Sequence, residues 1–293
     1  MGKPDRYVGT STAEGIAFYR ALENHFPPSM RIYDDPYAKY FLSDAALELL
    51  NEPAWLKATG ARAAREIPGV NGAIAIRVRF FDDYLNQCLK EGFRQVVLLG
   101  AGYDTRAYRF GEVRRRAKVY EFDHPDIQNH KISILRQLFK PLPVHVSFVP
   151  IDFKSESFGS KLIDAGFRTE QLALFIWEGV TMYLSNDSVD DTLNFVSRKC
   201  AAGSRIIFDY FPSTIVDGTC SFPEAQGLTE RVTALSEAFR FGIDSDRLDG
   251  FLASHGLNII RHCNARTLKQ RYFKGAAKSR PVSSLFSFAV AEV

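Results

Sequence analysis

The stretch of residues 95–106 constrains the fold of this chain more than any other. Its four apolar residues at 96–99, two of them β-branched, predict a buried parallel strand. Gly100 and Gly102 follow the strand, and glycine permits both a positive φ and the close approach of a ligand to the backbone. Asp104 then favours the start of a helix, because its side chain accepts hydrogen bonds from free backbone N–H groups. Together these features predict a nucleotide-type site at the carboxyl end of a sheet strand.

The two glycines alone do not decide whether this turn binds a ligand or is only structural. A dinucleotide-binding fingerprint has a third glycine, and Thr105 stands in that position here. A tight turn between a strand and a helix also uses two glycines for purely structural reasons. The rest of the chain must therefore decide between a structural turn and a ligand site.

Composition narrows the class of protein. A chain of 293 residues is long enough for one large α/β domain, and a net charge of +3 argues against a dedicated nucleic-acid binder. The four cysteines are scattered, which favours a reducing, cytoplasmic location over a disulfide framework, and the six histidines show no metal-ligand spacing. The sequence has no apolar run long enough to cross a bilayer, so we expect neither a membrane nor a nucleic acid as partner.

Strand and helix patterns alternate along the middle of the chain. Apolar runs predict strands at 95–99, 118–123, 144–149, 172–177, 204–210 and 257–262, with helical patterns between them. This alternation predicts a parallel sheet with helices on both faces. The final apolar stretch, 285–293, follows a loop rather than a crossover helix, which favours an antiparallel strand at or near the sheet edge.

Two segments stand outside this alternation. Residues 1–75 show helix and turn signals without a strand, and residues 212–245 begin rich in proline, glycine, serine and threonine and then turn helical over 229–239. We therefore expect a single domain with a helical cap at 1–75, a sheet core at 76–211 and 246–293, and an inserted lid at 212–245. The open crevice of an α/β sheet lies at the carboxyl ends of its strands, where a lid would close.

Acidic residues end two of the predicted strands. Asp123 lies 21 residues after Gly102, where a carboxylate can accept hydrogen bonds from both hydroxyls of a ribose. Asp152 precedes Phe153, and this pair suits the amine and the ring of an adenine. Taken singly, either acid could instead cap a helix.

Five motifs in order resemble one known family. They are residues 77–82 (RVRFFD), 100–106 (GAGYDTR), 121–125 (EFDHP), 149–153 (VPIDF) and 178–184 (EGVTMYL). The set is similar to the leucine carboxyl methyltransferase family, in particular its bacterial branch related to polyketide O-methyltransferases, over about residues 10–293. The resemblance implies a seven-stranded class I methyltransferase fold, a Rossmann-like sheet that uses S-adenosyl-L-methionine.

The resemblance also implies roles for single residues toward the methionine part of this cofactor. Gly100 and Gly102 would line it, Arg77 would hold its carboxylate, and Glu178 would lie near its amino group. On the adenosine side, Asp123 would bind the ribose, while Asp152 and Phe153 would hold the adenine. The acceptor side varies within such a family and does not carry over.

The acceptor is inferred from chemistry instead. A carboxylate is already an anion at neutral pH and needs only alignment and desolvation, whereas a phenol needs a general base. The strand-end motifs contain no histidine except His124, beside the ribose acid, so we expect a carboxylate on a small, largely apolar molecule. Tyr103, Tyr183 and Arg106 are the candidate donors to that carboxylate.

Other functions remain open from the sequence. The methyl group could go to a phenol or hydroxyl of a natural product instead of a carboxylate. The chain could also hold the cofactor without catalysis. A nicotinamide oxidoreductase is a further alternative, which the missing third glycine and the antiparallel end of the sheet disfavour. The oligomeric state is not indicated by the sequence.

Overall fold

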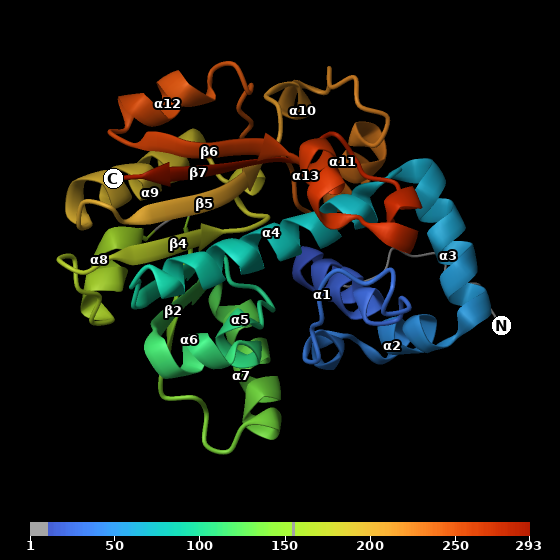
Figure 1. Cartoon of the computed structure of the whole chain (residues 1–293), viewed down its shortest axis with the longest axis horizontal. Helices are drawn as coiled ribbons and strands as arrows, with labels where there is room; N and C mark the ends of the chain where they lie inside the picture. Colours follow the sequence, from blue (N-terminus) through green and yellow to red (C-terminus); the bar gives the residue numbers. More distant parts are fainter. Residues whose placement is uncertain (1–10, 154–155) are drawn as a thin grey trace.

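The computed structural model describes residues 11–153 and 156–293 and contains one mixed seven-stranded sheet (Figure 1). The spatial order of the strands is β3-β2-β1-β4-β5-β7-β6. Their bounds are β1 Gln95–Leu99, β2 Lys118–Asp123, β3 Val146–Pro150, β4 Ala173–Trp177, β5 Arg205–Tyr210, β6 Asn258–Asn264 and β7 Ser287–Glu292.

The first five strands are parallel, and β7 is antiparallel to both of its neighbours, β5 and β6. The predicted final antiparallel strand is therefore confirmed, and it lies one place in from the edge that β6 forms. Because β1 to β5 run the same way, their carboxyl ends, at Leu99, Asp123, Pro150, Trp177 and Tyr210, meet at one side of the sheet.

Helices cover both faces of the sheet, as predicted. Alternate residues of β1 explain its unbroken apolar run: Val96 and Leu98 pack on one face, and Val97 and Leu99 on the other. The first face is covered by α4 Val70–Lys90, α5 Arg106–Arg109, α6 Gly111–Arg116, α7 Pro125–Leu138 and α13 Ala265–Tyr272. The second is covered by α8 Phe158–Asp164, α9 Asn186–Lys199 and α12 Leu248–Ser254.

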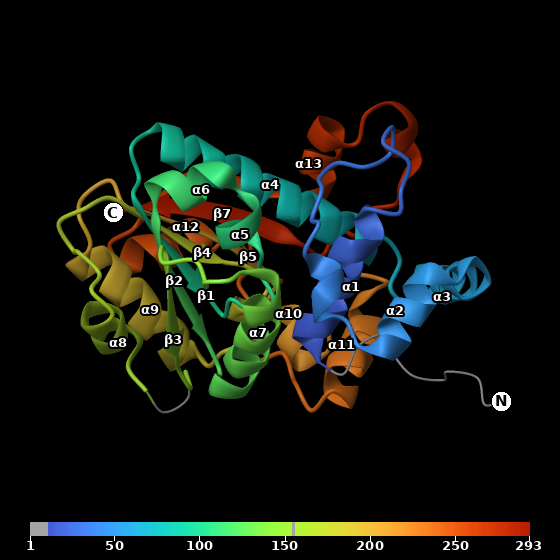
Figure 2. The ribbon, with the colours of Figure 1, turned by 90° about the horizontal axis from the view of Figure 1, so that it is seen from below.

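Within residues 11–75, the described part of the amino-terminal segment, the chain forms helices and turns and no strand, as the sequence predicts. Its elements are α1 Thr12–Glu23, η1 Ala38–Phe41, α2 Asp44–Asn51 and α3 Pro53–Glu66. Polar caps explain where two of them start: the side chain of Ser11 accepts from the Glu14 N–H at α1, and that of Ser43 accepts from the Ala46 N–H at α2. These helices lie beyond the carboxyl ends of the parallel strands, as Figures 1 and 2 show.

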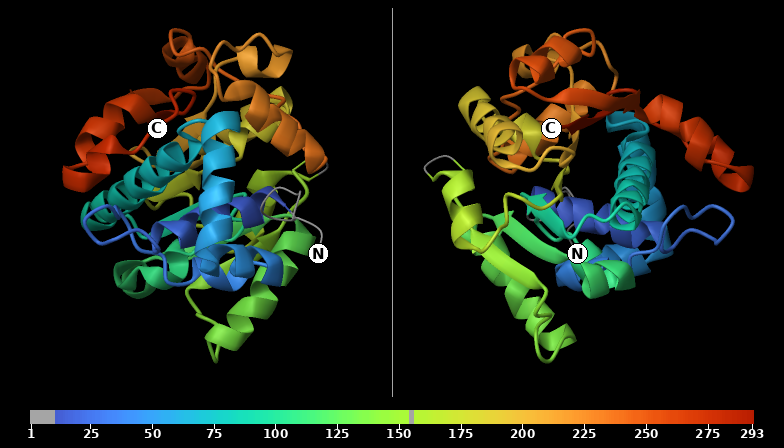
Figure 3. Two further views of the ribbon diagram at one scale, coloured as in Figure 1. Left: turned by 90° about the vertical axis from the view of Figure 1, so that its right-hand side faces the viewer. Right: turned by 60° about the vertical axis from the view of Figure 1, so that its left-hand side comes forward.

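The inserted segment lies at the same end of the molecule. It contains α10 Thr214–Asp217 and α11 Ala225–Ala234, and the left panel of Figure 3 shows the orange α11 beside the blue helices of the amino-terminal segment. Gly227 of α11 lies so close to α3 that a Cβ there would be 2.1 Å from the Glu66 carbonyl oxygen. The two segments that the sequence singles out thus meet directly.

The predicted helix at 229–239 is displaced from the observed one. The observed α11 starts four residues earlier and ends five earlier, at Ala225 and Ala234. The chain then turns at Ser236, which has a φ of 61°, and Arg240 donates its backbone N–H to the Met182 carbonyl at 2.8 Å. Contact with the loop after β4 has replaced helical hydrogen bonds over 236–240.

Candidate active site

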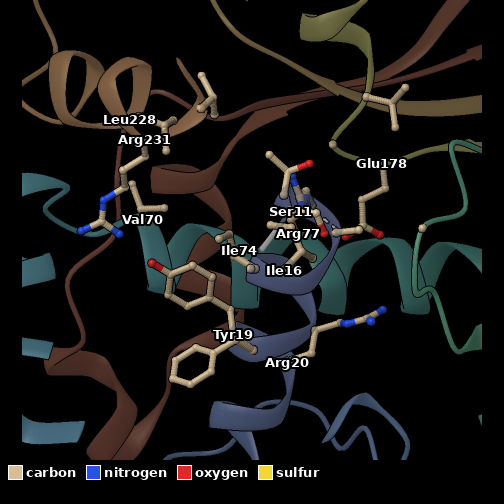
Figure 4. Close-up of a pocket in the computed structure, with 18 of the residues that line it drawn as sticks. Ser11, Ile16, Tyr19, Arg20, Val70, Ile74, Arg77, Glu178, Leu228 and Arg231 are labelled. Carbon is tan, nitrogen blue, oxygen red and sulfur yellow. Dashed lines mark hydrogen bonds and ion pairs between the residues drawn. The ribbon is translucent and has the colours of Figure 1, made fainter. Parts of the chain in front are cut away.

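A cavity of about 1010 Å³ lies between the carboxyl ends of the strands and the two added segments. Nine of the ten residues predicted for the site line it, and Arg106 does not. The nine are Arg77, Gly100, Gly102, Tyr103, Asp123, Asp152, Phe153, Glu178 and Tyr183. Figure 4 shows part of its wall, with residues from α1, α4 and α11 around the opening and Glu178 at one side. The predicted position of the site, at the carboxyl ends of the strands, agrees with this cavity.

The glycine turn after β1 has the conformation that its sequence requires. Gly100 and Gly102 have φ values of 65° and 44°, which favour glycine strongly over other residues. A Cβ on Gly100 would lie 2.5 Å from the Cγ2 of Val180, so the turn also packs tightly against the loop after β4. A Cβ on Gly102 would meet Ala13 at an ordinary 3.6 Å.

Asp123 lies at the end of β2 and faces this turn. Its carboxylate accepts hydrogen bonds from the Gly102 N–H at 2.5 Å and from the His124 N–H at 2.7 Å. Burial raises the pKa of this carboxyl, and the two backbone donors oppose that shift. Asp123 is not the side-chain cap of α7, because His124 takes that place and accepts from the Asp126 N–H.

Asp152 and Phe153 follow β3 and line the same half of the cavity as Asp123. The Ile151 N–H donates to the Asp123 carbonyl at 2.9 Å, which ties the end of β3 to the end of β2. The Phe153 carbonyl accepts from the Ser188 hydroxyl at 3.2 Å. An acid and an aromatic residue therefore follow β3, the strand next to the one that ends at the proposed ribose acid.

Arg77 projects from α4 into the wall of the cavity and is buried. Its Nε lies 3.0 Å from the Glu178 Oε1 and its Nη1 lies 2.8 Å from the Asp209 Oδ2. Gly179 makes room for this side chain, because a Cβ there would lie 3.0 Å from the Arg77 Nη1. The guanidinium is thus held by two carboxylates that follow or end different strands.

Arg106 is the predicted site residue that stands behind the cavity wall. Its Nη1 lies 2.6 Å from the Glu178 Oε2 and its Nε lies 2.7 Å from the Asp82 Oδ1. Asp104 also pairs with it, and although burial raises the pKa of Asp104, Arg106 with Arg20 and Lys131 lowers it to about 2. The expected contact of Arg106 with an acceptor is therefore not what this geometry favours, because its guanidinium is directed at three carboxylates. One of these carboxylates, that of Glu178, lines the cavity.

The two predicted tyrosines both line the cavity. Tyr103 stacks on Phe41 with ring centroids 4.9 Å apart, and burial raises the pKa of its hydroxyl to about 12. Tyr183 lies in η2 Thr181–Tyr183, 5.5 Å from the Phe239 ring, and burial raises its pKa further. Both hydroxyls stay protonated at neutral pH, so they are suited to donate hydrogen bonds rather than to act as bases.

Sequence reasoning missed Asp209. It is fully buried near the end of β5, where it accepts from Arg77 and from the Gly179 N–H. A signal was present, because Asp209 is the only acid in the strand Arg205–Tyr210 (RIIFDY), whose centre is otherwise apolar. A charged residue in a buried strand needs a partner of opposite charge.

The other half of the cavity is largely apolar. Ile16 of α1, Val70 and Ile74 of α4 and Leu228 of α11 line it together with Tyr19 (Figure 4). Arg231 of α11 brings a charge to this half. No motif in the sequence predicts these side chains for the site.

Over residues 11–153 and 156–293, no helix combines the length and apolarity needed to cross a membrane. Nor do His, Cys, Asp and Glu side chains in this part of the chain form a group of three or more arranged to hold a metal ion.

Comparisons with known sequences and structures all find similarity to methyltransferases. Residues 13–197 match the sequence profile of the family described as leucine carboxyl methyltransferase. A protein of Frankia alni, named as a candidate S-adenosyl-L-methionine-dependent methyltransferase, is 32% identical over 251 residues, covering 85% of this chain and 83% of that protein. One of Mycobacterium marinum with the same description is 31% identical over 260 residues, with 85% and 82% covered. The crystal structure of a candidate methyltransferase from Thermobifida fusca shares the fold, with a TM-score of 0.62 at 14% identity over 94% of this chain and 93% of that one.

Proposed function

The chain belongs to the leucine carboxyl methyltransferase family and is an S-adenosyl-L-methionine-dependent methyltransferase, and we propose that it methylates oxygen, forming a methyl ester on the carboxylate of a small, largely apolar molecule. The observation that carries this proposal is the pair of buried tyrosines, Tyr103 and Tyr183, in the cavity wall. Both hydroxyls are protonated at neutral pH, so they can donate hydrogen bonds to an anion, and neither can accept the proton of a neutral hydroxyl.

The chemistry of the transfer supports a carboxylate acceptor. A carboxylic acid has a pKa of about 4 and is already ionised, whereas a phenol, with a pKa of about 10, must first lose a proton. Among the described residues that line the cavity, His124 is the one histidine, and it is half exposed and bound to the start of α7. An acceptor that needs no proton removed fits this set of side chains best.

We call the part of the cavity lined by the loops after β1 to β4, from Gly100 to Glu178, the strand-end half. Its residues suit the cofactor, which supplies an activated methyl group on a sulfonium. In this proposal Gly100 and Gly102 let it approach the backbone, Asp123 binds the ribose, and Asp152 and Phe153 hold the adenine. Acids in this half complement a ligand that carries a sulfonium and an ammonium group.

Arg77 and Glu178 are proposed to orient the methionine end, the arginine toward its carboxylate and the acid toward its amino group. Their mutual ion pair fixes both side chains before the ligand arrives, which reduces the entropy lost on binding. Tyr103 and Tyr183 would then align the acceptor carboxylate, and the apolar half would strip its water.

The chemistry of the product tests this function. Incubation with labelled S-adenosylmethionine and a panel of small apolar carboxylic acids and phenols is expected to yield methyl esters, which mild base hydrolyses with loss of the label. A labelled product that resists mild base, as an aryl ether does, would contradict the carboxylate acceptor. Failure to bind S-adenosylhomocysteine by calorimetry would contradict the cofactor assignment.

We also propose that residues 11–75, the described part of the predicted cap at 1–75, and residues 212–245 form a lid over this cavity. The helix α3 lines the cavity, and none of its fourteen residues is fully buried, so little buried surface opposes its movement together with α11. We expect S-adenosylhomocysteine to slow tryptic cleavage at Lys57, Arg65 and Arg240. Cleavage at Arg114 of α6, which is exposed away from the cavity, is the control and is expected to keep its rate. If the ligand leaves the cleavage rate unchanged at Lys57, Arg65 and Arg240 as well as at Arg114, the proposed closure is ruled out.

A further inference from the structure

Acids and cations are unevenly distributed on the cavity wall: the half at the strand ends carries both signs, since Arg77 pairs there with Glu178. All five acids that line the cavity belong to the strand-end half or to the loop after α11: Asp104, Asp123, Asp152, Glu178 and Glu237. The charged side chains that α3 and α11 contribute are all cationic: Lys57, Arg62 and Arg231. Figure 4 shows Arg231 and Glu178 at opposite sides of the cavity, with Ile16 and Ile74 drawn between them. The proposed function assigns the acids at the strand ends to the cofactor and assigns no role to the cations of α3 and α11.

Arg231 has a defined environment at the far end. Burial raises the pKa of Tyr19, whereas the Arg231 guanidinium, which is hydrogen-bonded to the tyrosine hydroxyl, lowers it. Figure 4 shows the Tyr19 hydroxyl directed toward Arg231. Glu66 holds the guanidinium from outside the cavity lining, with its Oε2 2.8 Å from the Arg231 Nη2, and also lies 3.8 Å from the Arg62 Nε. These contacts fix the direction of the arginine.

A guanidinium held in this way is suited to a planar anion. It carries five N–H donors in a fixed fork, a geometry that matches the two oxygens of a carboxylate. Only 18% of the Arg231 side chain is exposed, and charge pairing is stronger at such a site than in bulk water. The neighbouring walls, formed by Val70 and Leu228, suit a hydrocarbon chain leading toward this end.

We propose that Arg231, assisted by Tyr19, binds a second anionic group of the acceptor, at the end remote from the atom that is methylated. The acceptor is then an apolar molecule with an anionic group at each end, of which a linear dicarboxylate is the simplest example. This inference rests on the proposed function for the assignment of the apolar half to the acceptor. It adds a residue that selects the substrate to those that align the reacting carboxylate.

The test compares octanedioate with octanoate, which differ only in the second carboxylate. Binding of each to the protein saturated with S-adenosylhomocysteine is measured by calorimetry. We expect octanedioate to bind about tenfold more tightly or better, the worth of hydrogen bonds to a charged group. The opposite order would follow from apolarity alone, since octanoate is the more hydrophobic acid.

Variants assign that preference to Arg231. Arg231→Gln is expected to bind both acids alike, while Arg247→Gln, an exposed arginine that does not line the cavity, keeps the preference. Arg231→Gln also removes the ion pair with Glu66, so Glu66→Gln serves as the second variant: it loses the pair, retains the guanidinium and is expected to keep or increase the preference. Equal binding in the unmodified protein, or a preference that survives Arg231→Gln, would overturn the inference.

The binding test of Arg231 can fail or succeed independently of the product test for ester formation. Binding to the S-adenosylhomocysteine complex needs no methyl transfer, so a base-stable product would refute ester formation and leave the binding comparison to decide the role of Arg231. Absence of binding by either acid at millimolar concentration would overturn the inference. Esters formed equally fast from both acids at limiting concentration would also overturn it and leave the proposed function intact.

Discussion

Replacing Asp209 with alanine is expected to lower the free energy of unfolding by about 3 kcal/mol, because breaking a buried ion pair leaves an uncompensated charge. Asp209 is fully buried and its Oδ2 lies 2.8 Å from the Arg77 Nη1. Its removal would leave the Arg77 guanidinium with Glu178 alone, which Arg106 already shares, and would deprive the Gly179 N–H of its acceptor. We expect the lower end of the usual 3–5 kcal/mol because Glu178 remains.

Urea denaturation measures this change, with Asp246→Ala, at an exposed acid outside the network, as the control. The isosteric Asp209→Asn variant keeps an oxygen for the Gly179 N–H but loses the charge. We therefore expect its stability to lie between that of Asp209→Ala and that of the unmodified protein. Affinity for S-adenosylhomocysteine should decrease in both Asp209 variants, because Arg77 loses its orientation. A loss of under 1 kcal/mol in Asp209→Ala, similar to that of the control, would contradict the role given to this pair.

The sheet core is predictable because its signals are local. Each of the first five strands is a short segment with an apolar run or with apolar residues at alternate positions, and the alternation with helical patterns predicts the parallel arrangement without knowledge of any contact. The insertion is less predictable. Whether α11 ends at Ala234 or continues to Phe239 depends on the contact of Arg240 with Met182, 58 positions away in the sequence, which no local pattern contains.

The same distinction applies to the site. Gly100, Asp123 and Asp152 each follow or end a strand, so topology alone brings them to one cavity. The partners of the arginines are not set by topology. Arg77 pairs with Asp209, which is 132 positions away in the sequence, and the sequence offers several other carboxylates as possible partners. From the sequence we expect Arg106 to contact the acceptor as a hydrogen-bond donor to its carboxylate, yet its guanidinium pairs with the carboxylates of Asp82 and Asp104, and the residue does not line the cavity.

Replacing Asp123 with alanine is expected to weaken the binding of S-adenosylhomocysteine by about 10- to 150-fold, the worth of roughly 1.5–3 kcal/mol for hydrogen bonds to a charged group. The structure gives this carboxylate a second task, because it accepts the backbone N–H groups of Gly102 and His124. A simple loss of affinity could therefore come from a loosened glycine turn as well as from a lost contact with the ribose. The measurement must distinguish the two.

Comparison of S-adenosylhomocysteine with its analogue lacking both ribose hydroxyls makes that distinction. The unmodified protein and Asp126→Ala, at an exposed acid three residues further along, are expected to prefer the natural ligand. Asp123→Ala should bind the two ligands with nearly equal affinity, since the group that reads the hydroxyls is gone. If the variant binds both more weakly but keeps the full preference for the hydroxylated ligand, Asp123 acts only by bracing the turn. In that event the ribose contact belongs to another residue of the strand-end half.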